Sequence, residues 1–357
     1  MPAFTYVDQP DRIAINFDQQ SIIGVDTEFM REKTFYSQLC LVQLATRDDI
    51  YCVDPLAGNE MSRFWQAIDT CKWVLHSARQ DIEVVYQTAK FMPANIFDTQ
   101  IATGLLGYAP QMGYAGLIKE LFDVELAKSH TRANWASRPL RDEYLEYAAE
   151  DVEYLLPAYD ELMTRLDKLG RTQWAEWDSR LMLDPSLYDI DANKAIARLK
   201  GARNLRGRQR AAAKRLAGWR EHEAMTRDRP RQWILRDNVL VDIAFRLPSE
   251  FAELARIESM PPKLLQRAGD TIVSVVAESA ADLSDYPPPG PPDEEQKLLL
   301  KKMQSMVAEC ANDLGIAAEI IASKKELAAV ISGGNRDSRI FGGWRKELIG
   351  DHLISLV

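Results

Sequence analysis

The sequence predicts an α/β domain, in which helices cover a mixed β-sheet, followed by all-α helical modules. Three β-rich runs joined by short connections, SIIGVDTEF (21–29), QLCLVQLAT (38–46) and DIYCVDP (49–55), predict an antiparallel meander. Strand and helix patterns then alternate to about Gly170, and the strand signal nearly vanishes beyond residue 190. Hairpin-linked strands followed by such alternation are typical of a mixed sheet packed against helices.

The later elements follow in order. MSRFWQAIDTC (61–71) has helical spacing, and KWVLHS (72–77) reads as a short buried strand. RQDIEVVYQTA (79–89) is amphipathic and predicts a helix. Asp98, in FDTQ, is expected to cap a helix beginning with IATGLL (101–106).

A chain of 357 residues is long enough for two or three domains. We expect the α/β domain over residues 1–190 and helical modules over 205–285 and 292–357. The proline-rich stretch SDYPPPGPPDEEQ (284–296) is expected to be a linker. The C-terminal GGNRDSRIFGGW (333–344) lacks the Lys-Ser/Thr ending of a phosphate loop and is expected to be a flexible turn.

The net charge of −9 hides a strong asymmetry. Residues 1–160 carry 13 basic and 24 acidic side chains, whereas residues 194–236 carry 14 basic and 3 acidic ones. This division suggests that the N-terminal region (residues 1–160) binds cations and that the segment 194–236 binds anions. The segment contains a cluster of seven cations that is either an RNA-backbone contact or a solubilising face: Arg203, Arg206, Arg208, Arg210, Lys214, Arg215 and Arg220.

Several protein classes are disfavoured. The four cysteines show no C-x-x-C spacing, so buried free thiols are expected instead of a zinc site. No stretch approaches 18 consecutive apolar residues, which argues against a membrane span. The N-terminus shows no signal-peptide pattern, so a cytoplasmic protein without membrane association is expected.

Two carboxylates stand at the end of the first apolar strand. Asp26 and Glu28 are two residues apart, so on a strand they point to the same face and repel each other. An isolated D-x-E of this kind is most simply explained as a strand running out into solvent. Other acids change that interpretation.

Further acids follow predicted buried elements. Asp81 lies on the first turn of a helix after a buried strand, where its charge also favours the helix dipole. Tyr147 and Asp151 are four residues apart and share one face of a later acidic helix. Each feature alone is consistent with a solvated surface. Together they predict a cage of hard oxygen ligands suited to two divalent ions, Mg²⁺ or Mn²⁺.

In this order and spacing, DTEF, HSARQD, FDTQ and YAAED resemble the DEDD 3′→5′ exonucleases of the tyrosine type. Longer matches resemble ribonuclease D, notably DTEFMREKTFYSQLCLVQL, YCVDPLAG and KSHTRANWASRPL. The resemblance implies a ribonuclease H-like catalytic domain over about residues 5–185. Residues 205–285 resemble an HRDC module, and residues 292–357 a second, divergent copy.

The resemblance implies a role for each matching residue. Asp26, Glu28, Asp81 and Asp151 would bind the metal ions, and Tyr147 would orient the attacking water. The implied substrate contacts are Phe29, Met30, His76, Lys128 and Arg138. For all of them except Met30, a structural or solvent-exposed role is an equal alternative. One departure is Asn134, where the family usually has Asp.

The function implied is a metal-dependent 3′→5′ exoribonuclease that releases nucleoside 5′-monophosphates from RNA 3′ ends, with tRNA precursors as substrates. We expect a monomer. A DNA exonuclease remains a rival, because carboxylates do not sense the 2′-hydroxyl. A catalytically silent RNA-binding adaptor is a second rival, which the intact set of acids disfavours.

Overall fold

The computed structural model describes residues 2–10, 21–58, 60–126, 133–282, 293–333 and 337–357. The chain forms two compact units. The first contains residues 1–30, 38–188 and 292–357, and the second contains residues 31–37 and 189–291. Each unit is described by itself.

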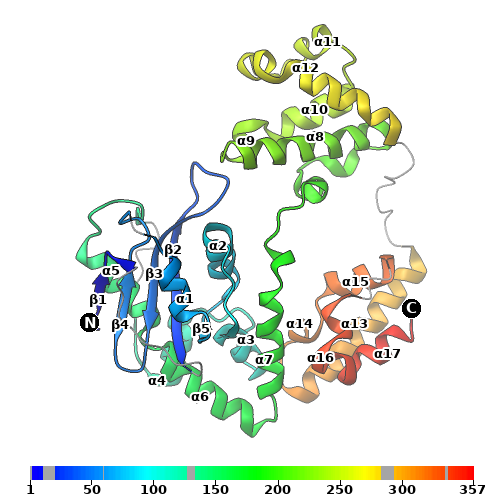
Figure 1. Cartoon of the computed structure of the whole chain (residues 1–357). Helices are drawn as coiled ribbons and strands as arrows, with labels where there is room; N and C mark the ends of the chain where they lie inside the picture. The colour runs from blue at the N-terminus through cyan, green and yellow to red at the C-terminus, as the bar shows by residue number, and fades with distance from the viewer. Residues whose placement is uncertain (1, 11–20, 59, 127–132, 283–292, 334–336) are drawn as a thin grey trace. The chain divides into compact units, whose positions relative to one another are not determined.

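A six-stranded mixed sheet lies at the centre of the first unit, in the order β1-β4-β3-β2-β5-β6 (Figure 1). Its strands are β1 (Thr5–Val7), β2 (Ile22–Met30), β3 (Gln38–Ala45), β4 (Ile50–Val53), β5 (Lys72–Leu75) and β6 (Asn95–Asp98). β2, β3 and β4 pair antiparallel, which confirms the predicted meander. The other neighbours pair parallel, which makes the sheet mixed as expected.

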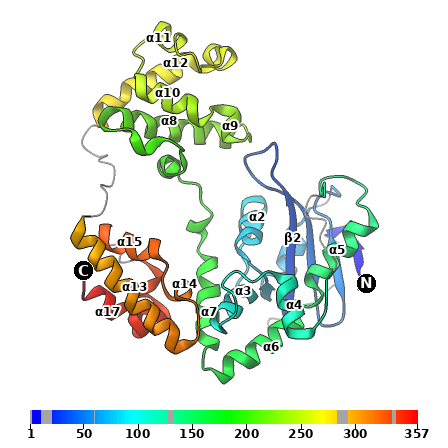
Figure 2. The same cartoon turned by 180° about the vertical axis from the view of Figure 1, so that it is seen from behind.

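Helices pack against both faces of this sheet (Figures 1 and 2). They are α1 (Ser62–Ile68), α2 (Arg79–Ala89), α3 (Thr99–Leu105), α4 (Tyr114–Phe122), α5 (Asp142–Glu153), α6 (Leu155–Lys168) and α7 (Thr172–Arg180). Trp73 of β5 packs with residues of α1 and α2, whereas its neighbour Val74 packs with residues of α3 and α6. This alternation along one strand gives the sheet two apolar cores. Asp98 caps α3 as predicted, because its carboxylate accepts from the N–H groups of Gln100 and Ile101.

Residues 293–357 form a C-terminal helical module within the first unit. Its helices are α13 (Glu294–Leu314), α14 (Ala318–Ile321), α15 (Lys324–Gly333), η7 (Arg339–Phe341), α16 (Gly343–Arg345), η8 (Lys346–Gly350) and α17 (Asp351–Ile354). The module shares one hydrophobic core with α3, α6 and α7. The indole rings of Trp174 and Trp344 stack with centroids 4.4 Å apart.

The prediction of a flexible turn at residues 333–344 is wrong for residues 337–344, which the structure describes. Arg339–Phe341 forms a 3₁₀ turn, and α16 begins at Gly343. The guanidinium of Arg345 is fully buried and forms two hydrogen bonds of 2.5 and 2.7 Å with the carboxylate of Asp178. Tertiary contacts therefore order a segment whose glycine-rich sequence suggested a loop.

The second unit is all-α, as predicted for the region after residue 190. Short 3₁₀ turns include η4 (Ala192–Arg198) and η5 (Ala202–Asn204), and the helices are α8 (Gly207–Thr226), α9 (Arg231–Ile234), α10 (Asp237–Arg246), α11 (Phe251–Ala255) and α12 (Pro262–Glu278). The expected linker at 284–296 falls mostly outside the described residues. Among the helices that the structure describes, none has the length and apolar character needed to cross a membrane.

Only part of the predicted basic cluster is free to meet a polyanion. Arg220 is buried and donates to the carboxylate of Asp237 at 2.6 Å. Arg215 pairs with Glu278 at 2.6 Å. In contrast, Arg203 of η5 and Arg206, the residue before α8, are exposed, and the Arg206 guanidinium donates to the backbone carbonyls of Arg203 and Leu205. The cluster is thus divided between fold-stabilising ion pairs and surface cations.

Candidate active site

Three of the predicted acids meet where β2 ends beside α5. Asp26 and Glu28 lie on β2, and Asp151 comes from the C-terminal half of α5, which packs on β2, β3 and β4. One carboxylate oxygen from each of the three lies within 4.8 Å of the others. The pairing register of β2 shifts between Glu28 and Phe29. Asp151, which lies 125 positions after Asp26 and 123 after Glu28 in the sequence, thus joins them in one acidic cluster.

Asp81, the fourth predicted acid, is held beside this cluster by a hydrogen bond. The hydroxyl of Thr27 donates to the Asp81 carboxylate at 2.6 Å, and Asp81 is buried at the start of α2. Asp98 fixes the turn before α2, because its carboxylate accepts from the N–H groups of Ser77 and Ala78 at 3.1 and 2.8 Å. Sequence reasoning assigned no role to Thr27, although it is the middle residue of the D-T-E motif.

Burial and mutual repulsion disfavour the ionised form of these acids. Burial first, and then the charges of Asp151 and Asp81, raise the pKa of Glu28 to about 8. Burial is also the main reason that the pKa values of Asp81 and Asp151 rise to about 7. The pKa of Asp26 is raised well above its ordinary range by burial and then by Asp81, Asp151 and Glu28. Such a cluster stores repulsion that a cation would relieve.

This repulsion predicts an unusual pH dependence of stability for the metal-free protein. An acid whose pKa is raised on folding keeps protons that the unfolded chain has released, so the free energy of unfolding falls as pH rises. For Glu28 the loss spans about pH 4.5 to 8. We expect the melting temperature in EDTA to fall between pH 5 and 8 and Mg²⁺ to restore it at pH 8, measured by scanning calorimetry. A melting temperature that rises over this range and ignores Mg²⁺ would contradict the prediction.

Tyr147 lies beside the acids and is hydrogen-bonded to Asp151. Burial, followed by the charges of Asp151 and Glu28, raises the pKa of its phenol well above the ordinary value. The hydroxyl therefore stays protonated and can donate a hydrogen bond. Tyr114, which sequence reasoning missed, lies near the same acids, and its hydroxyl accepts from the N–H of Tyr154 at 3.0 Å.

The donor set fits a hard divalent cation. Asp26, Glu28 and Asp151 supply clustered carboxylate oxygens without thiolate or imidazole, the ligand type preferred by Mg²⁺ and Mn²⁺. Their pKa values are raised first by burial and then by neighbouring carboxylates, so a positive charge beside them would favour the ionised forms. A divalent cation supplies that charge.

The predicted substrate contacts lie in different environments. Phe29 and Met30 follow Glu28 on β2 and are half-buried, and each packs against a different apolar cluster. The imidazole of His76 has both nitrogens engaged, Nε2 with the carbonyl of Met112 and Nδ1 with Thr99 Oγ1, each at 2.9 Å. Burial lowers the pKa of His76, which favours the neutral form of this half-buried imidazole.

Arg138 has a structural environment. Its guanidinium donates to both oxygens of the buried Asp54 carboxylate at 2.6 Å and to the carbonyl of Cys40 at 2.7 Å. These contacts count against the predicted phosphate contact. Lys128 lies outside the described residues. Asn134 is exposed, and its backbone carbonyl accepts from Ser137 at 3.1 Å.

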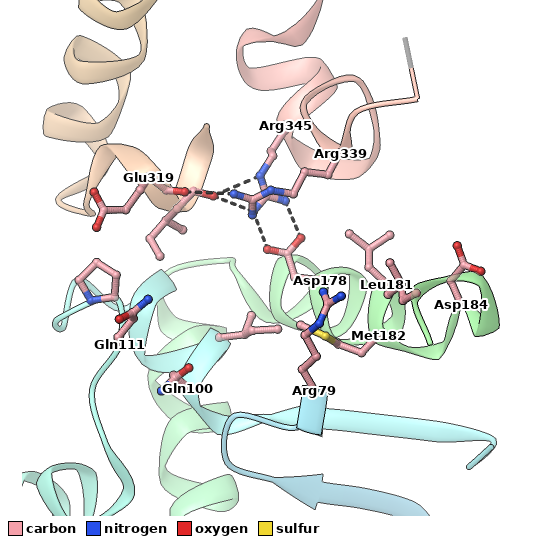
Figure 3. A pocket seen from close by; sticks show the side chains of 14 residues that line it. Arg79, Gln100, Gln111, Asp178, Leu181, Met182, Asp184, Glu319, Arg339 and Arg345 are labelled. Atoms are coloured by element: carbon pink, nitrogen blue, oxygen red, sulfur yellow. Dashed lines mark hydrogen bonds and ion pairs between the residues drawn. The ribbon is translucent and has the colours of Figure 1, made fainter. Parts of the chain in front are cut away.

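A cavity of about 630 Å³ lies elsewhere in the first unit (Figure 3). In Figure 3, Arg79 of α2 and Gln100 of α3 project into it, whereas Arg339 and Arg345 approach from the C-terminal module. The side chains that line it include none of the four acids. The cavity is therefore lined both by residues between 79 and 187 and by residues of the C-terminal module.

The fold and the acidic cluster together define a 3′–5′ exonuclease. Residues 4–167 match the 3′–5′ exonuclease family, and residues 209–276 match the HRDC domain family. Ribonuclease D of Pseudomonas paraeruginosa is 34% identical over 346 residues, covering 94% of this chain and 92% of that protein. Ribonuclease D of Bartonella henselae is 33% identical, covering 92% and 83%.

A solved structure supports the same assignment. Escherichia coli RNase D, described as an exoribonuclease involved in structured RNA processing, superposes with a TM-score of 0.86 at 26% identity, covering 99% of this chain and 98% of that one. The chain belongs to the ribonuclease D family of 3′–5′ exoribonucleases. The resemblance and the fold class inferred from the sequence are confirmed.

Proposed function

We propose that the protein hydrolyses RNA from its 3′ end and releases nucleoside 5′-monophosphates, with 3′-extended tRNA precursors among its substrates. The observation that carries this proposal is the convergence of Asp26, Glu28 and Asp151 beside Tyr147. We further propose two divalent ions, Mg²⁺ or Mn²⁺, as cofactors. A monomer acting in the cytoplasm completes the proposal.

Asp26, Glu28, Asp81 and Asp151 would hold the ions. Bound cations of this kind supply charge that stabilises the attacking and leaving oxygens of an in-line phosphoryl displacement. The burial that raises the pKa values of the acids also strengthens their attraction for a bound cation. Thr27 keeps the Asp81 carboxylate oriented through its 2.6 Å hydrogen bond.

Tyr147 would orient the attacking water through its hydroxyl. A phenol with so high a pKa does not act as a base near neutral pH, so its contribution is a positioned hydrogen bond. Replacing Tyr147 with Phe is expected to lower kcat by about 10²-fold, the effect of losing one positioned group. RNA affinity in metal-free buffer should stay near the wild-type value, measured by fluorescence anisotropy. A variant with normal kcat and weakened affinity would assign Tyr147 to substrate contact instead.

RNA capture by the second unit rests on its HRDC match and on its surface cations. Arg203 of η5 and Arg206, the residue before α8, are exposed, and cations of this kind contact phosphates without reading sequence. The proposed role is to retain structured RNA while its 3′ end is hydrolysed. The buried or paired members of the cluster, Arg220 and Arg215, are not included.

One assay tests the function directly. Single-stranded RNA, DNA of the same sequence and a 3′-extended tRNA, each 5′-labelled, are incubated with full-length protein in Mg²⁺, Mn²⁺ or EDTA. We expect stepwise shortening of both RNAs in either metal, none in EDTA, and slower shortening of DNA. Faster hydrolysis of DNA would favour a DNA exonuclease. Binding without hydrolysis in any metal would favour an RNA-binding adaptor.

A further inference from the structure

Gln43 of β3 is a fully buried polar side chain without an observed role. Its exposed fraction is 0%, and neither its amide nitrogen nor its amide oxygen has a hydrogen-bond partner in the described part of the chain. Leaving a buried polar group unsatisfied costs about 1–3 kcal/mol. Groups of this kind therefore call for an explanation, such as an ordered water or a role in the active site.

The strand register places Gln43 next to the acidic cluster. Gln43 lies directly opposite Asp26 in the antiparallel pair of β2 and β3. Directly opposite residues project from the same face of a sheet with Cβ atoms about 4.5–5.5 Å apart. For Asp26 this is the face covered by α5, because Asp26 clusters with Asp151 of that helix. The Gln43 side chain therefore projects from β3 toward α5, the helix that carries Tyr147 and Asp151.

The other neighbours of Gln43 on this face offer it little hydrogen bonding. Leu41 is two residues away on β3, and Cys52 lies opposite on β4. Both belong to an apolar cluster with Leu145, Ala148 and Ala149 of α5. The strongest hydrogen-bonding group that the register places beside Gln43 is therefore the Asp26 carboxylate.

We infer that Gln43 is a positioning residue, whose amide binds a buried water that donates a hydrogen bond to the carboxylate of Asp26. A buried water needs about two to four polar partners, and the amide oxygen, the amide nitrogen and the carboxylate supply them. Such a link would orient Asp26 toward the cation without adding charge to an already acidic cluster. This inference rests on the proposed metal-dependent function and deepens it.

The test separates metal binding from fold stability. Gln43→Met keeps the length of the side chain and removes the amide. We expect it to weaken Mn²⁺ affinity by about 10-fold or more, the usual effect of losing an outer-shell partner of a metal ligand. The melting temperature in EDTA should be unchanged or higher, because an unsatisfied group has been removed. Isothermal titration calorimetry and thermal unfolding of full-length protein measure the two quantities.

The control is Cys52→Ala, which disturbs the same buried layer on the side away from Asp26 and should bind Mn²⁺ normally. Normal Mn²⁺ affinity in Gln43→Met would show that the amide is only a core group, and the inference would fail. Loss of folding in both Gln43→Met and Gln43→Leu would also overturn it, because the amide would then stabilise the fold itself. A wild-type protein that binds no Mn²⁺ would instead refute the proposed function.

Discussion

Replacing Asp151 with Asn is expected to abolish RNA hydrolysis while leaving the fold intact. The variant keeps the size of the side chain and removes one of the three clustered carboxylates. Because the proposed reaction depends on cations held by these carboxylates, we expect the rate of RNA hydrolysis in Mg²⁺ to fall by at least about 10³-fold. The measurement is the initial rate of shortening of a 5′-labelled RNA at saturating concentration.

The same variant should be more stable than wild type when metal is absent. Burial and neighbouring charges raise the pKa of Asp151, which means that its ionised form opposes folding. At pH 8 in EDTA, Asp151→Asn should therefore melt at a higher temperature. Asp142→Asn is the matched control, because Asp142 is exposed at the start of the same helix and should affect neither quantity. Near wild-type hydrolysis by Asp151→Asn would refute the metal-site assignment.

Replacing Asp178 with Ala is expected to give the largest loss of stability. The substitution leaves the Arg345 guanidinium, which is fully buried, without its carboxylate partner. Breaking a buried ion pair in this way costs about 3–5 kcal/mol. Arg345 also donates to the carbonyls of Ile320 and Ile321, so the substitution is expected to destabilise the C-terminal module as well. Urea unfolding followed by circular dichroism measures the free energy.

Two further variants make this prediction specific. Asp160→Ala removes the partner of Arg47 in an exposed pair and should cost less than about 1 kcal/mol. The double variant Asp178→Leu/Arg345→Met removes both charges and should recover much of the loss, because apolar pairs often replace buried ion pairs well. If Asp178→Ala lowers the free energy of unfolding by less than about 1 kcal/mol, the Arg345 guanidinium must be solvated by water in the variant, and the prediction is wrong.

The Asp178–Arg345 pair changes how the C-terminal region is understood. From the sequence, residues 292–357 are a separate module beyond a linker. In the structure they share a hydrophobic core with α3, α6 and α7, and Arg171 donates to the carbonyls of both Leu105 and Leu314 at 2.6 Å. The resemblance of this region to a second HRDC domain stays a prediction. Its packing makes it part of the compact unit that carries the acids.

The sequence by itself determined the antiparallel meander, the alternation that follows it and the four acids with Tyr147. These features are marked by local patterns, such as alternating apolar residues, capping acids and short motifs. Such patterns can be recognised in the sequence without knowing which distant residues are in contact. The motif order was also enough to identify the family. The roles of Arg138 and of the basic cluster, in contrast, could not be predicted from residue type. An arginine that pairs with a carboxylate, as Arg138 does with Asp54, cannot be distinguished in the sequence from one that binds a phosphate.

Only the tertiary structure decided which residues meet. Strand register places Gln43 opposite Asp26, and a one-residue slip would have turned it to the other face. Thr27 reaches Asp81 across 54 residues, and Asp178 reaches Arg345 across 167. Contacts at such separations leave no periodic signal in the chain, since each depends on how whole elements pack. The cluster of acids is therefore visible in the sequence, whereas the side chains that hold it in place are visible only in the fold.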